Sequence, residues 1–195
     1  NNATTIAAVR KGQFQIHGDT KITTVALQAD GPLWQLPGGA LRMAVGAEYR
    51  RDALGGLLES GSTAAPVLVP NGISRNVYAG FAELFVPLFG ASNAMPGLRR
   101  LDLSLAGRHE DYSDFGTTTN PKFGLNWSPV DGLLIRSSWG KSFRAPGLAE
   151  NDPKSGGYGL YGDTLPCSHR PPATTCFGIG RAGGNPDLKP ERATT

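Results

Sequence analysis

The sequence contains few of the residues that build catalytic or metal centres. It has two cysteines and three histidines in 195 residues, and the histidines (His17, His109 and His169) lie far apart along the chain. No His-Glu-x-x-His, cysteine-cluster or Gly-x-Ser-x-Gly pattern occurs, and no glycine-rich phosphate loop opens a helix. We therefore expect no catalytic residue, no metal site and no cofactor, and an enzyme is the class of protein that the sequence supports least.

Long apolar runs and a strong net charge are missing as well. No stretch of roughly 18 consecutive apolar residues occurs, which excludes a transmembrane helix. The net charge is only +3, and basic residues stand beside acidic ones, so we expect no nucleic-acid partner. The first residues lack the basic and then apolar regions of a signal peptide. We expect the sequence to be an internal piece of a larger protein.

The sequence is instead rich in turn-forming residues placed between alternating segments. Its 27 glycines and 15 prolines cluster between stretches in which apolar and polar residues alternate, as in turn-rich all-β chains. The clearest region, residues 101–146, contains three such segments and two tight turns, which predicts an antiparallel β-meander. The predicted strands are about 20–30, 40–52, 76–88, 100–113, 118–128 and 133–144.

Charged and apolar residues occupy opposite faces of these predicted strands, because successive side chains of a strand point to opposite sides. Leu101, Leu103 and Leu105 share one face, for example, and the same face carries no charge on the other strands. The opposite, polar face carries Arg42, Glu48, Arg50, Glu83, Arg100, Asp102, Arg108, Glu110, Lys122, Arg136 and Arg144.

Two architectures produce this alternation: a soluble β-sandwich with one wet face and a membrane barrel with a polar lumen. Strand length favours the barrel, because these strands approach the roughly 9–11 residues that a bilayer crossing needs. Trp127 and Trp139 lie on the apolar face near strand ends, where barrels carry aromatic girdles. A secreted sandwich that binds carbohydrate through its loops stays open as the alternative.

Several separated motifs follow one another along most of the chain. They are LPGGALRMAVGAEYR (36–50), ELFVPL (83–88), AGRHEDYSDFG (106–116), NPKFGLNWSP (120–129), GKSFRAP (140–146) and NPDLKPE (185–191).

In their order and sequence, these motifs resemble the barrel domain of TonB-dependent outer-membrane receptors. The resemblance implies a fragment of a large, about 22-stranded transmembrane barrel. It also implies energy-coupled uptake of a scarce nutrient (a ferric siderophore, cobalamin or a carbohydrate) across the outer membrane of a Gram-negative bacterium. The implied partners are outer-membrane lipid, the small ligand and the TonB complex, which would be contacted through an N-terminal region absent from this sequence. A passive porin is a further alternative.

Loop lengths predict the sidedness of such a barrel, because periplasmic turns are short and extracellular loops long. We expect connections 31–39, 89–99 and 129–132 on the periplasmic side, and 53–75, 113–118 and 145–190 on the extracellular side. The loop 145–190 contains Cys167 and Cys176, for which a disulfide is favoured over a metal or redox site.

Four residues of the same loop, Lys154, Tyr158, Tyr161 and Arg170, could form an aromatic and basic ligand surface. The alternative is that these aromatic rings only pack the loop against itself. Arg144, near the rim, could likewise contact ligand or serve only the structure.

Overall fold

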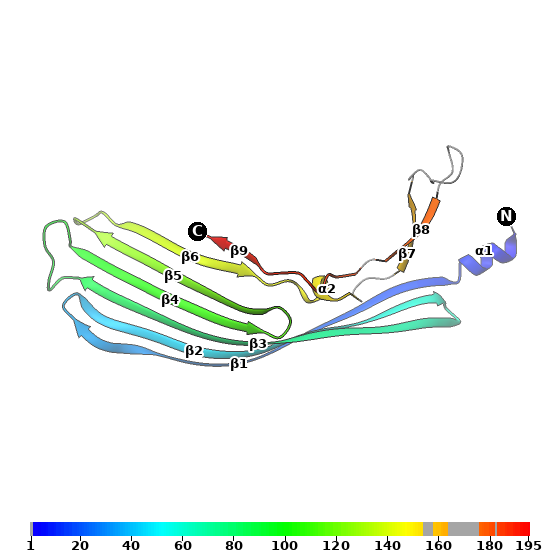
Figure 1. The fold of residues 1–195 in the computed structure, drawn as a ribbon, viewed down its shortest axis with the longest axis horizontal. Helices are drawn as coiled ribbons and strands as arrows, with labels where there is room; N and C mark the ends of the chain where they lie inside the picture. Colours follow the sequence, from blue (N-terminus) through cyan, green and yellow to red (C-terminus); the bar gives the residue numbers. More distant parts are fainter. Residues whose placement is uncertain (1, 154–157, 164–175, 182) are drawn as a thin grey trace. The chain divides into compact units, whose positions relative to one another are not determined.

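The computed structural model describes all residues except 1, 154–157, 164–175 and 182, and it is an all-β fold built on one antiparallel sheet (Figure 1). The sheet is open and has the strand order β1-β2-β3-β4-β5-β6-β9, so six consecutive strands form a meander. A separate hairpin pairs β7 with β8. The elements are α1 (Ala3–Val9), β1 (Gly12–Leu36), β2 (Gly39–Ser62), β3 (Ala65–Phe89), β4 (Arg100–Tyr112), β5 (Gly116–Ser128), β6 (Ile135–Arg144), α2 (Leu148–Asn151), β7 (Tyr158–Asp163), β8 (Cys176–Arg181) and β9 (Glu191–Thr194).

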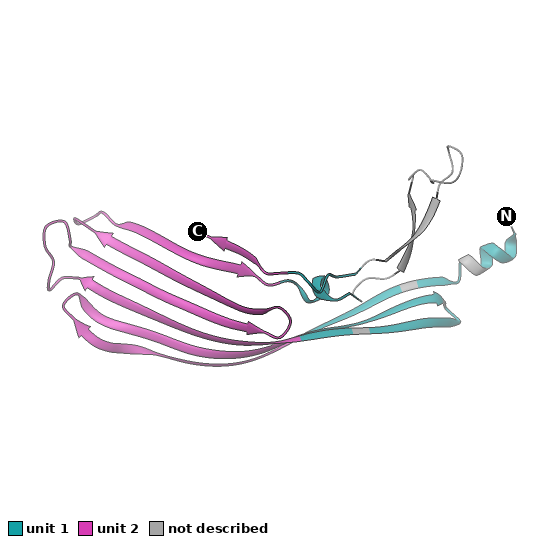
Figure 2. Ribbon diagram, in the orientation of Figure 1, with its two compact units in different colours: residues 1–21, 53–74, 146–188 teal, residues 22–52, 75–145, 189–195 magenta. Residues whose placement is uncertain are grey.

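The chain divides into two compact units, drawn in different colours in Figure 2. Unit 1 consists of residues 1–21, 53–74 and 146–188, and unit 2 of residues 22–52, 75–145 and 189–195. Unit 2 contains β4, β5, β6 and β9 in full, together with parts of β1, β2 and β3. The residues with candidate functions on the sheet all lie in unit 2.

The first three strands are much longer than the sequence predicts. The expected loop 53–75 is wrong, because β2 continues to Ser62 and β3 begins at Ala65, which leaves a turn of two residues. The expected connection 31–39 likewise shrinks to the turn at Pro37 and Gly38. The glycines and prolines of these segments predict that the strands end there. In the structure, hydrogen bonding between neighbouring strands continues past these residues.

The N-terminal segment and the long connection 145–190 also contain regular structure. Residues 1–19, for which the sequence indicates only a loop or strand end, form α1 and the beginning of β1. The connection 145–190 contains α2 and the strands β7 and β8. The predicted extracellular loop is therefore partly folded.

The register of β3, β4 and β5 keeps the two faces of the sheet separate. Leu84 of β3 lies opposite Leu105 of β4, which in turn lies opposite Phe123 of β5. On the other face Phe81 lies opposite Arg108. The first face is therefore apolar across neighbouring strands, whereas the other combines charged residues with the aromatic rings of β3, and such cross-strand pairs are the unit of sheet stabilisation.

One position in β2 requires glycine because an aromatic ring covers it. A Cβ atom on Gly46 would overlap atoms Cε1 and Cζ of Phe81 and would lie 3.0 Å from the carbonyl oxygen of Leu27. Because Gly46 has no side chain, the ring of Phe81 can pack directly against the backbone of β2. Glycine in a strand commonly marks such a close approach.

This contact predicts that Gly46→Ala destabilises the protein and that a smaller residue at 81 partly restores it. We expect Gly46→Ala to cost about 1–3 kcal/mol, the usual range for overpacking. In the Phe81→Ala background the same change should cost at least about 1 kcal/mol less. The midpoint of urea unfolding of the full-length protein in detergent micelles measures both values. Gly107→Ala is the control, because no atom lies within 4 Å of a Cβ built there; equal losses at the two glycines would contradict the packing argument.

Candidate functional site

One face of unit 2, called here the charged face, carries ion pairs on three adjacent strands. It is formed by the alternate residues of β2, β3 and β4 that include Glu48, Arg50, Arg75, Arg108 and Glu110. Ion pairs link residues far apart in sequence, such as Arg108 and Glu48. The charged face thus brings together four residues that the alternation of the sequence predicts to share a face, and it adds Arg75.

Asp52 is the centre of the first part of this network. Its carboxylate accepts hydrogen bonds from Nε of Arg50 at 3.1 Å and from Nε of Arg75 at 3.1 Å. Arg75 also lies 3.6 Å from Asp114. Only 8% of Asp52 is exposed, and a buried carboxylate is tolerated when it is both paired and hydrogen-bonded. Two guanidinium groups meet that requirement here.

Glu48 and Glu110 form the second part of the network through Arg108. The Arg108 guanidinium donates to Glu110 at 2.8 Å and to Glu48 at 3.3 Å. Glu48 also lies 3.6 Å from Arg50, which joins this part to Asp52. The network is therefore continuous across β2, β3 and β4, and networks of this kind contribute more than isolated surface pairs.

Tyr112 supports the network with an aromatic cluster at one end of β4. The guanidinium carbon of Arg75 lies 5.4 Å from the centre of the Tyr112 ring, within the range of a cation–π interaction. Phe115 stacks on the same ring at 4.4 Å, and Phe143 meets it edge-on at 5.8 Å. The Tyr112 hydroxyl donates to Glu110 at 3.4 Å. Tyr112 is thus held from all sides and is almost fully buried.

Burial in unit 2 is inverted relative to a soluble protein. Asp102 is 2% exposed and Glu110 5%, whereas Phe123 and Trp139 on the opposite face are 46% and 41% exposed. In soluble proteins carboxylates are almost never fully buried and large apolar side chains form the core. The apolar face of this sheet is therefore a surface made for apolar surroundings.

The remaining predicted residues occupy other parts of the charged face. Nε of Arg100 lies 2.6 Å from the buried carboxylate of Asp102. Arg42 and Glu83 line a hollow of about 480 Å³ together with Asp30. Lys122 lies on β5 and Arg136 on β6.

Arg144 is the exception among the predicted residues. Phe143, its neighbour on β6, contacts Tyr112 of the charged face, so the strict alternation that predicts the face of Arg144 does not continue to the end of this strand. The pairing of β5 with β6 ends at Lys122 and Gly140. The residue of β5 that would continue it is Pro121, which has no N–H to donate. Arg144 instead lies 2.9 Å from Glu191 on β9.

Sequence reasoning missed Asp52, Arg75, Tyr112 and Asp114. Arg75 was lost because it fell inside the predicted loop 53–75, which is strand in the structure. Asp52 and Tyr112 continue the alternation that includes Glu48 and Glu110, so the signal was present in the pattern of alternate residues. Asp114 lies in a turn, where alternation has no predictive value.

The predicted loop site falls partly outside the described residues. Lys154, Cys167 and Arg170 are not described, so the disulfide with Cys176 and the proposed ligand surface stay predictions. The backbones of Tyr158 and Tyr161 lie in β7, opposite Arg181 and Gly178 of β8.

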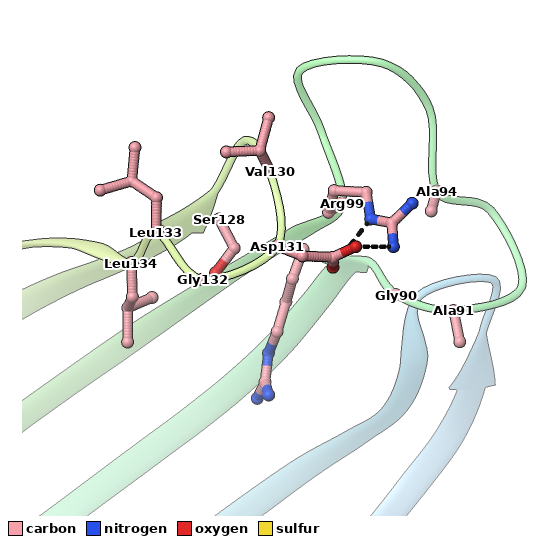
Figure 3. A pocket seen from close by; sticks show the side chains of 11 residues that line it. Gly90, Ala91, Ala94, Arg99, Ser128, Val130, Asp131, Gly132, Leu133 and Leu134 are labelled. Atoms are coloured by element: carbon pink, nitrogen blue, oxygen red, sulfur yellow. Dashed lines mark hydrogen bonds and ion pairs between the residues drawn. The ribbon is translucent and has the colours of Figure 1, made fainter.

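A second hollow, of about 660 Å³, lies where two turns of unit 2 meet (Figure 3). Arg99, before β4, and Asp131, in the turn before β6, both line it, and the Arg99 guanidinium donates to the Asp131 carboxylate at 3.2 and 2.5 Å. Nε1 of Trp127 donates to the carbonyl oxygen of Gly97 at 2.8 Å. These contacts fix the two turns to each other, and we assign this hollow no ligand.

Neither helix in the described part of the chain combines the length and apolar character needed to cross a membrane. Among the same residues, no three histidine, cysteine, aspartate or glutamate side chains gather as metal ligands.

The network predicts that loss of Arg75 is costly. We expect Arg75→Met to lower the free energy of unfolding by about 2 kcal/mol, because Asp52 then keeps a single guanidinium in a buried setting. Arg99→Met is the matched control, since its ion pair with Asp131 is largely exposed and should contribute less than about 1 kcal/mol. Urea unfolding of the full-length protein in micelles measures both; a larger loss in the control would refute the role given to Asp52.

Comparison with known proteins gives a family. The family model described as TonB dependent receptor-like, beta-barrel, matches residues 2–195. No curated protein matches the chain. Members of this family are receptors and transporters of the Gram-negative outer membrane, and the open antiparallel sheet is consistent with a piece of their barrel. The chain therefore belongs to the TonB-dependent receptor family, as part of its β-barrel domain.

Proposed function

We propose that the charged face lines the lumen of a receptor that takes up a scarce nutrient across the outer membrane, driven by the TonB complex. The ligand would be a ferric siderophore, cobalamin or a carbohydrate, and TonB would bind a region of the full protein that precedes this sequence. The inverted burial of unit 2 carries the proposal, because it combines buried carboxylates with exposed large apolar side chains. Lipid outside and a polar lumen inside require that combination.

A soluble β-sandwich is less well supported by the same observation. A sandwich covers its apolar face with a second sheet about 10 Å away. Leu105, Phe123 and Trp139 are 37%, 46% and 41% exposed on the apolar face, and Phe123 and Trp139 form a tilted aromatic pair there, with ring centres 5.4 Å apart. Aromatic side chains of this kind are suited to contact with lipid near a membrane interface.

The orientation of the two faces can be tested with a pair of neighbouring substitutions. We expect Leu105→Arg to cost about 2–4 kcal/mol, because an arginine on the lipid side of a barrel must be placed in hydrocarbon. Ser104→Arg is the matched control on the charged face, where Ser104 lies opposite Phe85 and Gly124. Both variants are made in the full-length gene, and heat-modifiable migration of outer-membrane fractions measures how much protein assembles. Equal assembly of the two variants would count against a lipid-facing Leu105.

Energy coupling is tested by uptake in the presence and absence of TonB. Cells that express the full-length protein are compared with cells that lack its gene, each with and without a functional TonB complex. The panel contains radiolabelled ferric siderophores, cobalamin and oligosaccharides. We expect at least one compound to enter at a rate that falls about tenfold or more without either the receptor or TonB.

Two outcomes would contradict the proposed function. Uptake that needs the receptor but is unchanged without TonB would identify a passive porin. Recovery of the full-length protein in the soluble fraction without detergent would identify a soluble β protein.

A further inference from the structure

Two basic side chains of the charged face differ from all those in the ion-pair network. Lys122 of β5 lies opposite Ala106 on β4 and Gly140 on β6, so both of its cross-strand neighbours are small. Arg136 of β6 lies opposite Asn126 of β5. Neither Lys122 nor Arg136 has an ion pair or hydrogen bond among the residues that the structure describes.

Hydrogen-bond donors fill the space between these two cations. Ser104, Gly124 and Ser138 lie side by side on β4, β5 and β6, in the row between the rows of Lys122 and Arg136. A Cβ atom on Gly124 would lie 3.4 Å from Cβ of Ser104. Because glycine has no side chain, the space between the two serines is left open. The two serine hydroxyls have no partner within the described part of the chain. They are free to donate to a bound group.

Two carboxylates lie in the rows of these cations. Glu83 of β3 lies in the row of Lys122, with Ala106 of β4 between them, and forms no ion pair in the described part of the chain. Asp102 is the acidic residue in the row of Arg136, two strands away, but it is 2% exposed and lies 2.6 Å from Nε of Arg100. In the network the carboxylates of Asp52, Glu48 and Glu110 each have an arginine partner. Across β3 to β6 these two rows therefore hold two cations without ion pairs and one unpaired carboxylate, Glu83, which leaves an excess of positive charge.

We propose that Lys122, Arg136, Ser104, Ser138 and Asn126 form a binding site for an anionic group of the transported solute, a carboxylate or a phosphate. The proposal rests on the proposed function, because it assumes that the charged face lines the lumen. Ammonium and guanidinium groups with hydroxyl and amide donors are the usual partners of such oxyanions. The site selects solutes with more than one anionic group over neutral ones of similar size.

The spacing of the two cations sets the size of the solute. Gly140, the partner of Lys122, lies four residues from Arg136 on β6, which is about 14 Å along the strand at 3.4 Å per residue. Lysine and arginine have long side chains, so two charged groups carried by backbones about 14 Å apart can both contact one solute placed over the serine row. A solute that bridges them therefore carries two anionic groups separated by a few bonds, as in a tricarboxylate or a pyrophosphate.

Binding of two probes to the purified full-length receptor tests the site. The receptor is placed in nanodiscs of neutral lipid at low salt, and affinities for citrate and for inorganic pyrophosphate are measured by calorimetry. We expect the double variant K122Q/R136Q to bind both probes about tenfold or more weakly, since two charge-assisted hydrogen bonds are lost. The matched control is R10Q/K11Q. It also removes one arginine and one lysine, but from the segment between α1 and β1, outside the rows of Lys122 and Arg136. The control should stay within about twofold of the native protein.

Two results would overturn the site. Equal affinities of K122Q/R136Q and the native receptor, or no binding of either probe to the native receptor, would show that the cations hold no solute. A lower unfolding midpoint of K122Q/R136Q, with R10Q/K11Q unchanged and no probe present, would show that a carboxylate of the protein itself occupies the site. Because TonB takes no part in these measurements, uptake that is independent of TonB would contradict the proposed function and leave the anion site standing.

Discussion

The buried carboxylate of Asp52 constrains the rest of the sheet. It needs the guanidinium groups of Arg50 and Arg75 at hydrogen-bond distance, and these lie on two different strands. A slip of one residue between β2 and β3 would move every side chain of one strand to the other face. It would leave Asp52 without Arg75 and would place charges among the apolar side chains. The pairing of Asp52 with two arginines therefore disfavours a hairpin in which β2 and β3 are paired in the wrong register.

The two parts of the charged face serve different purposes because their charges are balanced differently. In the network, Asp52, Glu48 and Glu110 are neutralised by Arg50, Arg75 and Arg108, and Tyr112 and Phe115 close the cluster from one end. Such a surface is rigid and offers few free donors. On β5 and β6, Lys122 lies between Ala106 and Gly140, Arg136 lies opposite Asn126, and neither side chain forms an ion pair in unit 2. If the charged face lines the lumen, as we propose, the first part would hold the shape of the wall and the second would contact the solute.

Much of this arrangement follows from the alternation of the sequence, because a strand has only two faces. The strands β4, β5 and β6 lie close to their predicted positions, and the separation of Leu105 from Arg108 follows directly from counting alternate residues. The long hairpin of β2 and β3 could not be predicted, since Gly55, Gly56 and Pro70 are typical of loops. Its strands persist because each added residue only extends a register that is already established. The ion-pair partners in the network could not be predicted either. Alternation shows on which face of the strand a side chain lies, but not which residue of the next strand lies beside it.

The long connection between β6 and β9 shows how such a barrel can vary its loop without losing its fold. In unit 2, β9 returns to pair with β6, and Glu191 lies opposite Arg144. In unit 1, the backbone N–H of Gly184 donates to Asp152 at 2.8 Å and that of Asn185 to Glu150 at 2.7 Å, so both ends of the excursion are bound to each other. A Cβ atom on Gly184 would overlap the carbonyl group of Glu150, which explains the glycine. Because the closure is made by main-chain groups of residues 150, 152, 184 and 185, it requires their backbone positions and not particular side chains at Glu150 and Asp152.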